Sequence, residues 1–377
     1  MKYLNEHFNY LISEGKYPGV DTLRFLAIIS VVLFHTSIPN DFWPARLGWL
    51  GVDLFFVISG FLIGSIIIQK LKKRQFSFPE FYKNRSLRIL PTYYFIIITT
   101  ALIKVSMLKS DSSLMWESIL SSVFFIQTTG PYFFNNPINY YYVPGGSWSL
   151  VVEEYFYLLA PLLLYFLFKI KKEYTPYILG ILIMLAIPLN ILITSHFHPN
   201  DYNWFFANSI QFHSRYVGLC LGVLAAYIIS LIEIKNQLKR YRTFCIFIST
   251  VIIICCASYL KLHPQFLLTP QTLTWQTVIL PSLIGSSFFF LLLASYNIKS
   301  LKWIVFLARL SFPLYLVHIL FIDALNIYFT NSIPLPWAEL SLVTLAICLP
   351  LSYIISLCIE YPFIRIYKKS TTSLNDR

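Results

Sequence analysis

The sequence predicts an all-α protein that crosses a membrane about ten times, with both termini in the cytoplasm. Of its 377 residues, 57% are hydrophobic and only 12% are charged, which is roughly half the charged fraction of an average soluble protein. The apolar residues occur in runs of about twenty, the length that a helix needs to cross the hydrocarbon core of a bilayer. We therefore expect a single membrane domain that covers residues 1–377 and contains no internal repeat.

Hydrophobic runs separated by polar linkers define the expected elements in order. The segment 114–129 is apolar but short, so we expect an interfacial or re-entrant piece there. Residues 1–18 are polar and lack the apolar core of a signal peptide. Ten spans are predicted, at approximately residues 21–39, 50–69, 89–107, 148–168, 176–195, 209–231, 243–260, 275–295, 303–329 and 338–360.

Lysine and arginine occupy alternate linkers, and this pattern predicts the orientation of the spans. Linker 70–88 contains seven of them, and basic residues also follow the fourth, sixth, eighth and tenth predicted spans. Because cytoplasmic loops are enriched in Lys and Arg, these linkers and both termini are predicted to be cytoplasmic. The net charge of +12 is explained by this pattern and by contact with membrane lipids, so we expect no nucleic-acid partner.

The cysteines and the aromatic residues have plain structural explanations. All six cysteines fall within or beside apolar runs, and none has metal-ligand spacing with histidine, so we expect small buried side chains and no metal. An aromatic stretch, 132–148, precedes the fourth span on the predicted outer side. An interfacial aromatic belt is the favoured explanation, and a surface on which sugar rings stack is the alternative.

The first predicted span contains two ionisable residues, Arg24 and His35, which are eleven positions apart. Eleven steps of about 100° return a helix to within about 20° of its starting face, about 16 Å further along. An arginine near a helix end often extends to the interface, and a lone histidine is often structural. Their shared face favours function instead, because ionisable groups inside a membrane domain usually mark a functional site.

Asp53 lies near the outer end of the second predicted span, at a depth similar to that of His35. A carboxylate among apolar side chains requires a partner, because an unpaired buried charge is costly. We expect Asp53 to bond one imidazole nitrogen of His35. Such a bond fixes the tautomer and leaves the other nitrogen as a base.

Arg85 and Arg88 stand three residues apart where the third predicted span begins, so they share one helix face. Arginine suits bidentate binding of phosphate. Ordinary positive-inside charge or contact with lipid headgroups is the alternative for either residue. The position of both at the predicted cytoplasmic side makes a phosphate-bearing ligand a reasonable expectation.

The fourth predicted span opens with Ser147, Trp148 and Ser149, and it contains Glu153 and Glu154. Ser149 and Glu153 are four residues apart on one face, so we expect the hydroxyl to reach the carboxylate. Neighbouring glutamates point about 100° apart, and this spacing favours Glu153 for the cavity that contains His35. Later polar positions receive less weight, namely His213, Arg215, His318 and Glu360.

Several of these segments together, in this order, resemble the acyltransferase 3 family of bacterial integral-membrane O-acyltransferases, over residues 17 to about 367. The resemblance implies a ten-helix enzyme in the bacterial inner (plasma) membrane. Its acyl donor would be cytoplasmic acetyl-CoA, and its acceptor a hydroxyl of an extracytoplasmic glycan such as O-antigen of lipopolysaccharide, capsule or exopolysaccharide. The segments are Arg24 to His35, Gly51 to Phe61, Arg85 to Pro91, Ser147 to Glu153, Ser311 to His318 and Glu360 to Phe363.

The resemblance also implies roles for individual residues. His35 would be catalytic with Asp53 in support, and Glu153 would support the acceptor side. Arg24, Arg85 and Arg88 would bind the donor, and Ser147, Trp148 and Ser149 would contact substrate. His35 would act as a general base or through an acyl-histidine. Many relatives carry an appended esterase-like domain, whereas this sequence ends at Arg377, so we expect the stand-alone form.

Two other functions compete with this interpretation. The first is an acyltransferase that acts on a small molecule or on a lipid-linked precursor. The second is a transporter or flippase that binds its cargo at the intramembrane charges. Transporters often contain inverted repeats with broken helices in matching halves, and the sequence contains no such repeat. The charged positions also cluster in the first four spans, and this distribution favours the enzyme.

Overall fold

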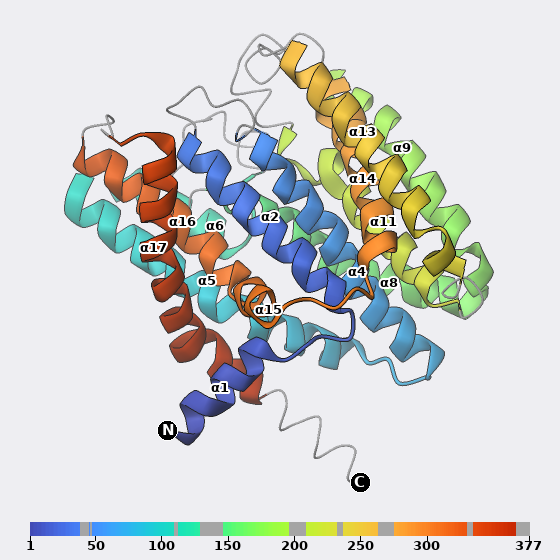
Figure 1. Ribbon diagram of the computed structural model, residues 1–377, viewed down its shortest axis with the longest axis horizontal. Helices are drawn as coiled ribbons and strands as arrows, with labels where there is room; N and C mark the ends of the chain where they lie inside the picture. The colour runs from blue at the N-terminus through green and yellow to red at the C-terminus, as the bar shows by residue number, and fades with distance from the viewer. Residues whose placement is uncertain are drawn as a thin grey trace.

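The structure is a computed structural model that describes residues 1–37, 45, 47–108, 112–128, 146–195, 209–231, 237–262, 275–329 and 335–366. Within these residues every regular element is a helix, so the predicted all-α class is confirmed (Figure 1). Nine of the described helices are long and apolar enough to cross a membrane, or ten if one bent pair counts as a single span. The protein is therefore a multi-pass membrane protein, as the composition predicts.

Nine long helices correspond to predicted spans one to eight and ten. In Figure 1, α2 and α4 lie in the middle of the view, and α9, α11, α13 and α14 lie to one side of them. The nine helices are α2 (Pro18–Ser37), α4 (Leu50–Lys72), α5 (Phe78–Leu108), α8 (Trp148–Ile170), α9 (Thr175–Ser195), α11 (Phe212–Ile229), α13 (Arg242–Leu262), α14 (Leu280–Ser295) and α17 (Trp337–Ile355), which runs on into the π-helical turn η6 (Ser356–Glu360).

The ninth predicted span, 303–329, is not one continuous helix, and this is a correction. The chain forms α15 (Lys302–Arg309) and then α16 (Ser311–Tyr328), with a bend of 59° between them. Pro313 has no N–H to donate to the carbonyl of Arg309, so a continuous helix is interrupted here. In the first turn of a new helix the missing donor has little cost, and α16 accordingly begins at Ser311.

Two further elements differ in extent from the prediction. Helix α5 begins at Phe78, eleven residues before the predicted start, so Arg85 and Arg88 lie inside a helix rather than at its first turn. The short apolar segment forms α6 (Ser112–Val123), whose 12 residues reach only about 18 Å. Tyr93 of α5 holds this helix by donating a hydrogen bond to the carbonyl of Ser122, at 3.1 Å.

The polar N-terminus forms α1 (Lys2–Ile12), a helix that the sequence patterns do not indicate. It packs against the end of α17: the Tyr3 hydroxyl donates to the carbonyl of Leu357 at 2.8 Å, and Glu6 pairs with Arg365 at 3.0 Å. Both ends of the described chain therefore lie at one end of the molecule (Figure 1). This agrees with an even number of spans, while the cytoplasmic location of that end stays a prediction.

The centre of the bundle is the contact between α4 and α11, which run parallel. A methyl group at Gly60 would lie 2.0 Å from the carbonyl oxygen of Leu219, and one at Gly222 would lie 2.2 Å from that of Val57. Small residues permit two helix backbones to approach this closely. In the apolar 18-residue stretch of the span that contains α4, 78% of the residues are buried, so α4 lies in the interior of the bundle.

Candidate active site

The site begins at the contact between α2 and α16. Arg24 Nη2 donates a hydrogen bond to Ser311 Oγ at 3.0 Å, and His35 Nδ1 lies 3.3 Å from His318 Nε2. Ser311 and His318 are seven residues apart, which is two turns of α16. Arg24 and His35 therefore lie on one stripe of α2, as their spacing predicts, and that stripe faces α16.

A cavity of about 160 Å³ lies beside this contact, between α2, α4, α5, α8 and α16. We call it the inner cavity. It is lined on one side by apolar residues that include Phe55 and Leu62, and its polar lining consists of Arg24, Ser59, Arg85, Arg88, Ser149, Glu153, Tyr157, Ser311 and Tyr315. The structure thus brings together the three arginines and Glu153 that the sequence singled out.

A larger cavity of about 490 Å³ adjoins the inner cavity at the end of the molecule that holds the chain termini. Five cationic side chains line this basic cavity: Lys70, Lys73, Arg85, Arg88 and Arg309. A third cavity has a volume of about 210 Å³. It shares Arg24 with the inner cavity, Arg309 with the basic cavity and Arg88 with both. Because Arg88 borders all three spaces, they adjoin one another. We call this row of arginine-lined cavities, from the basic end into the bundle, the arginine-lined route.

Glu153 is held by residues other than the one expected. The Ser59 hydroxyl of α4 donates to one carboxylate oxygen at 2.8 Å, and the Tyr157 hydroxyl donates to the other. Arg85 stacks on the ring of Tyr157, 4.1 Å from its centroid. The predicted bond from Ser149 to Glu153 is wrong, because the Ser149 hydroxyl instead pairs with the Tyr315 hydroxyl at 2.7 Å.

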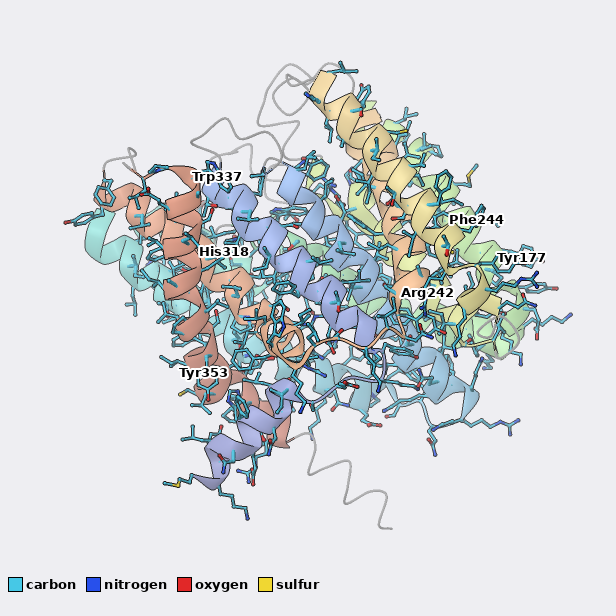
Figure 2. All side chains as sticks on the ribbon, viewed as in Figure 1. Tyr177, Arg242, Phe244, His318, Trp337 and Tyr353 are labelled. Carbon is cyan, nitrogen blue, oxygen red and sulfur yellow. The ribbon has the colours of Figure 1, made fainter. Side chains whose placement is uncertain are left out.

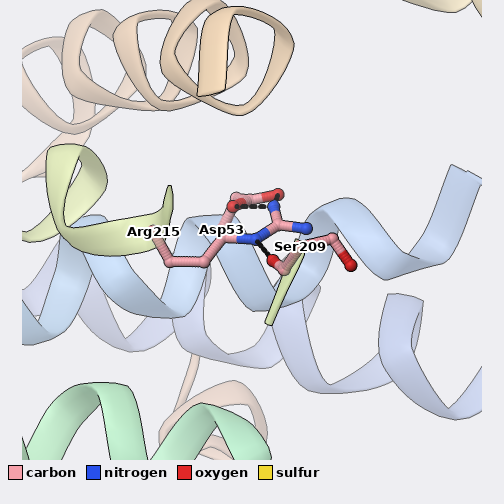
Figure 3. Close-up of polar contacts among 3 residues, drawn as sticks. All are labelled: Asp53, Ser209 and Arg215. Atoms are coloured by element: carbon pink, nitrogen blue, oxygen red, sulfur yellow. Dashed lines mark hydrogen bonds and ion pairs between the residues drawn. The ribbon is translucent and has the colours of Figure 1, made fainter. Parts of the chain in front are cut away.

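The predicted bond between Asp53 and His35 is also wrong. Asp53 pairs with Arg215 of α11, whose Nη1 lies 3.1 Å from its Oδ1, and the two side chains are only 6% and 9% exposed (Figure 3). Arg215 Nε also donates to the carbonyl of Ser209 at 2.5 Å. A permanently charged guanidinium inside the bundle needs a carboxylate more than a neutral imidazole does, which explains the choice of partner.

The three residues expected to contact substrate lie in three different surroundings. Ser149 lines the inner cavity. Trp148 stacks with Arg215, 5.7 Å from its guanidinium carbon, and so belongs to the Asp53 ion pair. Ser147 is buried and accepts a hydrogen bond from Gln127 Nε2 at 3.2 Å. Sequence adjacency on α8 therefore does not place these side chains in one pocket.

His35 does not line the inner cavity and approaches it through two aromatic neighbours. Its ring centroid is 5.1 Å from that of His318, which is 5.8 Å from that of Tyr315, a residue of the cavity wall. His318, labelled on α16 in Figure 2, is fully buried. His318 received little weight in the sequence analysis because its partner lies 283 positions away.

Sequence reasoning also gave little weight to Arg215 and Glu360, and it did not single out Arg309. Glu360 is 3% exposed on the π turn, and it interacts electrostatically with Arg88 and Arg24. It places a carboxyl group close to these arginines. In each case the sequence feature that could have identified the residue is an ionisable side chain at the edge of an apolar run. Within the described ranges, no group of three or more metal-ligating side chains occurs.

The protein is an integral membrane protein with a polar site inside its helix bundle. The arginine-lined route ends there beside a buried pair of histidines. The family to which the chain belongs follows from its sequence. A model described as "Acyltransferase domain" matches residues 17–360, so the protein is a member of the acyltransferase 3 family. No solved structure matches the chain.

Curated relatives with similar sequences include proteins from three bacteria. The chain is 29% identical to O-acetyltransferase OatA of Staphylococcus aureus over 59% of its own length and 36% of the relative's. It is 31% identical to peptidoglycan O-acetyltransferase OatA of Listeria monocytogenes over 48% of this chain and 30% of that protein. A putative peptidoglycan O-acetyltransferase of Bacillus subtilis, YrhL, is 31% identical over 44% and 25%. The chain thus spans about a quarter to a third of the length of these relatives.

Proposed function

We propose that this protein is a membrane-embedded O-acetyltransferase that moves an acetyl group from cytoplasmic acetyl-CoA to a hydroxyl of an extracytoplasmic glycan. The observation that carries the proposal is the arginine-lined route, which joins a basic cavity at the terminal end of the bundle to the inner cavity near His35 and His318. Membership of the acyltransferase 3 family supports the same reaction class.

The basic cavity suits the phosphate groups of the donor. Coenzyme A carries several phosphate charges, and guanidinium groups bind phosphate through paired hydrogen bonds. In this proposal Arg85, Arg88 and Arg309 hold these phosphates, with Lys70 and Lys73 nearby. The narrow pantetheine arm then extends past Arg24 and Arg88 into the inner cavity. Glu153 and Tyr157 line the inner end of this route, so we now assign Glu153 to the donor arm rather than to the acceptor.

His35 carries the chemistry in this proposal. Its imidazole takes the proton of the acceptor hydroxyl while the oxygen attacks the thioester carbonyl. The new C–O bond forms, the C–S bond breaks, and the thiolate of coenzyme A takes the proton back from the imidazolium. General-base catalysis of this kind contributes about 10²–10⁴-fold. An acyl-histidine route remains the alternative. Asp53 supports this centre indirectly, because its ion pair with Arg215 ties α4 to α11.

The acceptor is proposed to be a surface glycan that reaches the site from outside the cell. O-antigen, capsule and exopolysaccharide are candidates from the family resemblance. Two of the curated relatives are named for peptidoglycan, so peptidoglycan is the acceptor to test first. Small molecules, lipid-linked precursors and the transport of a cargo are the competing functions.

The deciding experiment uses the purified protein in liposomes with acetyl-CoA and a panel of glycans. Release of free coenzyme A should require an acceptor, and mass spectrometry should find one added acetyl group on that acceptor. Surface glycans from cells with and without the protein provide the matched comparison. Acceptor-independent passage of a solute across the liposome membrane, without acetylation, would replace the proposal with the transporter.

A further inference from the structure

Hydrogen bonds to backbone carbonyls determine where the protons of the two buried histidines lie. His35 Nδ1 is 2.9 Å from the carbonyl oxygen of Val31, and His318 Nδ1 is 3.0 Å from that of Leu314. A carbonyl oxygen only accepts, so each Nδ1 must carry the hydrogen. A neutral imidazole has a single N–H. The Nε2 atom of each ring is therefore left with its lone pair.

The contact between the two rings is compatible with the same assignment. His318 Nε2 and His35 Nδ1 are 3.3 Å apart, and one of them must donate. Because His318 Nε2 has only a lone pair, it accepts, and the Nδ1–H of His35 is shared between this nitrogen and the carbonyl of Val31. All three contacts are satisfied by one arrangement, in which a chain of hydrogen bonds runs from His35 through His318 to the carbonyl of Leu314.

This chain leaves His35 Nε2 as the one ring nitrogen in the pair that is not occupied. Within the described residues no hydrogen bond is made by that atom, whereas both nitrogens of His318 are engaged. Of the two rings, only His35 therefore has a lone pair available for a proton. The imidazolium that forms when His35 takes a proton keeps its Nδ1–H on two acceptors, so the ring does not turn.

We propose that His318 is a positioning residue, which together with the carbonyl of Val31 holds the Nδ1–H of His35 in place, so that Nε2 of His35 is the base. This inference rests on the proposed function only in assigning His35 Nε2 the role of a catalytic base. The tautomer itself is a property of the resting protein. The role needs an acceptor atom at the position of His318 Nε2, and the side-chain oxygen of glutamine occupies the equivalent position.

Three variants test the role. His318→Leu removes the acceptor and keeps a similar bulk, so kcat should fall about 10²-fold, the lower range of a general-base contribution, with the KM for acetyl-CoA unchanged. His318→Gln restores an acceptor and should recover most of the rate. Thr36→Val is the control: this neighbour of His35 is buried and bonds Ser341 at 2.6 Å, but it lies outside the chain of hydrogen bonds, so its kcat should be nearly normal.

A second experiment determines the tautomer of His35 in the resting protein, independently of catalysis. Solid-state NMR of the full protein with ¹⁵N-labelled histidine separates protonated from bare ring nitrogens, and His35→Gln assigns the signals. Wild type should give a protonated Nδ1 and a bare Nε2 at His35. In His318→Leu this Nδ1–H loses one of its two acceptors and keeps the carbonyl of Val31, so the Nδ1 signal should shift and the Nε2–H tautomer should gain population. A protonated Nε2 in wild type, or a loss in His318→Gln as deep as in His318→Leu, would overturn the inference. Failure of acetyl transfer with every acceptor would instead reject the function and leave the NMR result standing.

Discussion

Arg215 places a guanidinium between two indole rings and a carboxylate in the interior of the helix bundle. Its partner is Asp53, and the rings of Trp49 and Trp148 each lie 5.7 Å from its central carbon. Glu153 has the same character, because Ser59 and Tyr157 satisfy its oxygens. Each of these buried charges is thus satisfied by a residue from another helix or from the next turn, which is the condition for keeping a charge away from water.

The first prediction at this scale concerns the proposed base. His35→Ala should lower kcat for acetyl transfer by about 10²–10⁴-fold, because the hydroxyl loses the group that takes its proton. Binding of coenzyme A, measured by calorimetry on the protein in detergent, should be unchanged, since His35 lines none of the arginine cavities. Normal turnover by this variant would remove the catalytic assignment.

The second residue-scale prediction concerns the buried ion pair. Asp53→Leu leaves Arg215 as an uncompensated buried charge, so the free energy of unfolding should fall by about 3–5 kcal/mol. The double variant Asp53→Leu with Arg215→Met removes both charges and should be more stable than the single one. Thermal unfolding in one detergent compares wild type, the two single variants Asp53→Leu and Arg215→Met, and the double variant. Strictly additive losses would mean that the two residues do not act as a pair.

At the scale of elements, α16 joins the two ends of the site. Ser311 at its start accepts a hydrogen bond from Arg24, and His318 two turns later contacts His35. The break before α16 gives the helix a direction different from that of α15, which carries Arg309 to the basic cavity. One broken span thus supplies both the proposed donor site and the proposed base with partners.

The close contact of α4 and α11 leads to a prediction about glycine. Gly60→Ala should lower the unfolding temperature by several degrees, because its methyl group would overlap the carbonyl of Leu219 at 2.0 Å. Gly180→Ala on α9 is the matched control. A methyl group there meets nothing within 4 Å, so it should be neutral or stabilising by up to about 1 kcal/mol. Equal effects of the two changes would contradict the packing argument.

Two arginines that each lie over a tyrosine of α1 provide a matched pair for a test of the donor site. Arg309 lies 5.7 Å from the ring centroid of Tyr10, and Arg365 lies 5.7 Å from that of Tyr3. Only Arg309 lines the basic cavity. Arg309→Gln should raise the KM for acetyl-CoA about tenfold or more, the worth of one charge-assisted hydrogen bond, and Arg365→Gln should not. A fall in kcat alone for Arg309→Gln would show that it does not bind the donor.

At the scale of the whole molecule, the basic cavity and both ends of the described chain share one end of the bundle. If that end is cytoplasmic, the donor and the acceptor approach from opposite sides and meet near His35. Glu14 is exposed at this end, so a label at position 14 can show on which side of the membrane this end lies. Cys255 and Cys358 are exposed, although the sequence predicted buried cysteines, so both are changed to serine. Glu14→Cys in this background should react with a membrane-impermeant thiol reagent only in inside-out vesicles. Labelling of intact cells would show that this end faces the outside. The basic cavity could then not bind cytoplasmic acetyl-CoA.

The sequence was sufficient for those properties that depend on local composition. The length of the apolar runs predicts the spans, because crossing hydrocarbon requires a helix of about twenty apolar residues. Eleven-residue spacing places Arg24 and His35 on one stripe, and three-residue spacing places Arg85 and Arg88 on one face. Both results follow from helix geometry alone, so they hold in the folded protein.

Only the tertiary structure decided which buried groups meet. Asp53 and Arg215 are 162 positions apart, and His35 and His318 are 283 apart, so no helical period connects them. Depth in the membrane suggested that Asp53 would bond His35, but several helices present polar groups at the same depth. The partner is chosen by which helices pack together, and glycine contacts between α4 and α11 bring Arg215 to Asp53. The break at Pro313 likewise gives α16 the direction that brings His318 to His35.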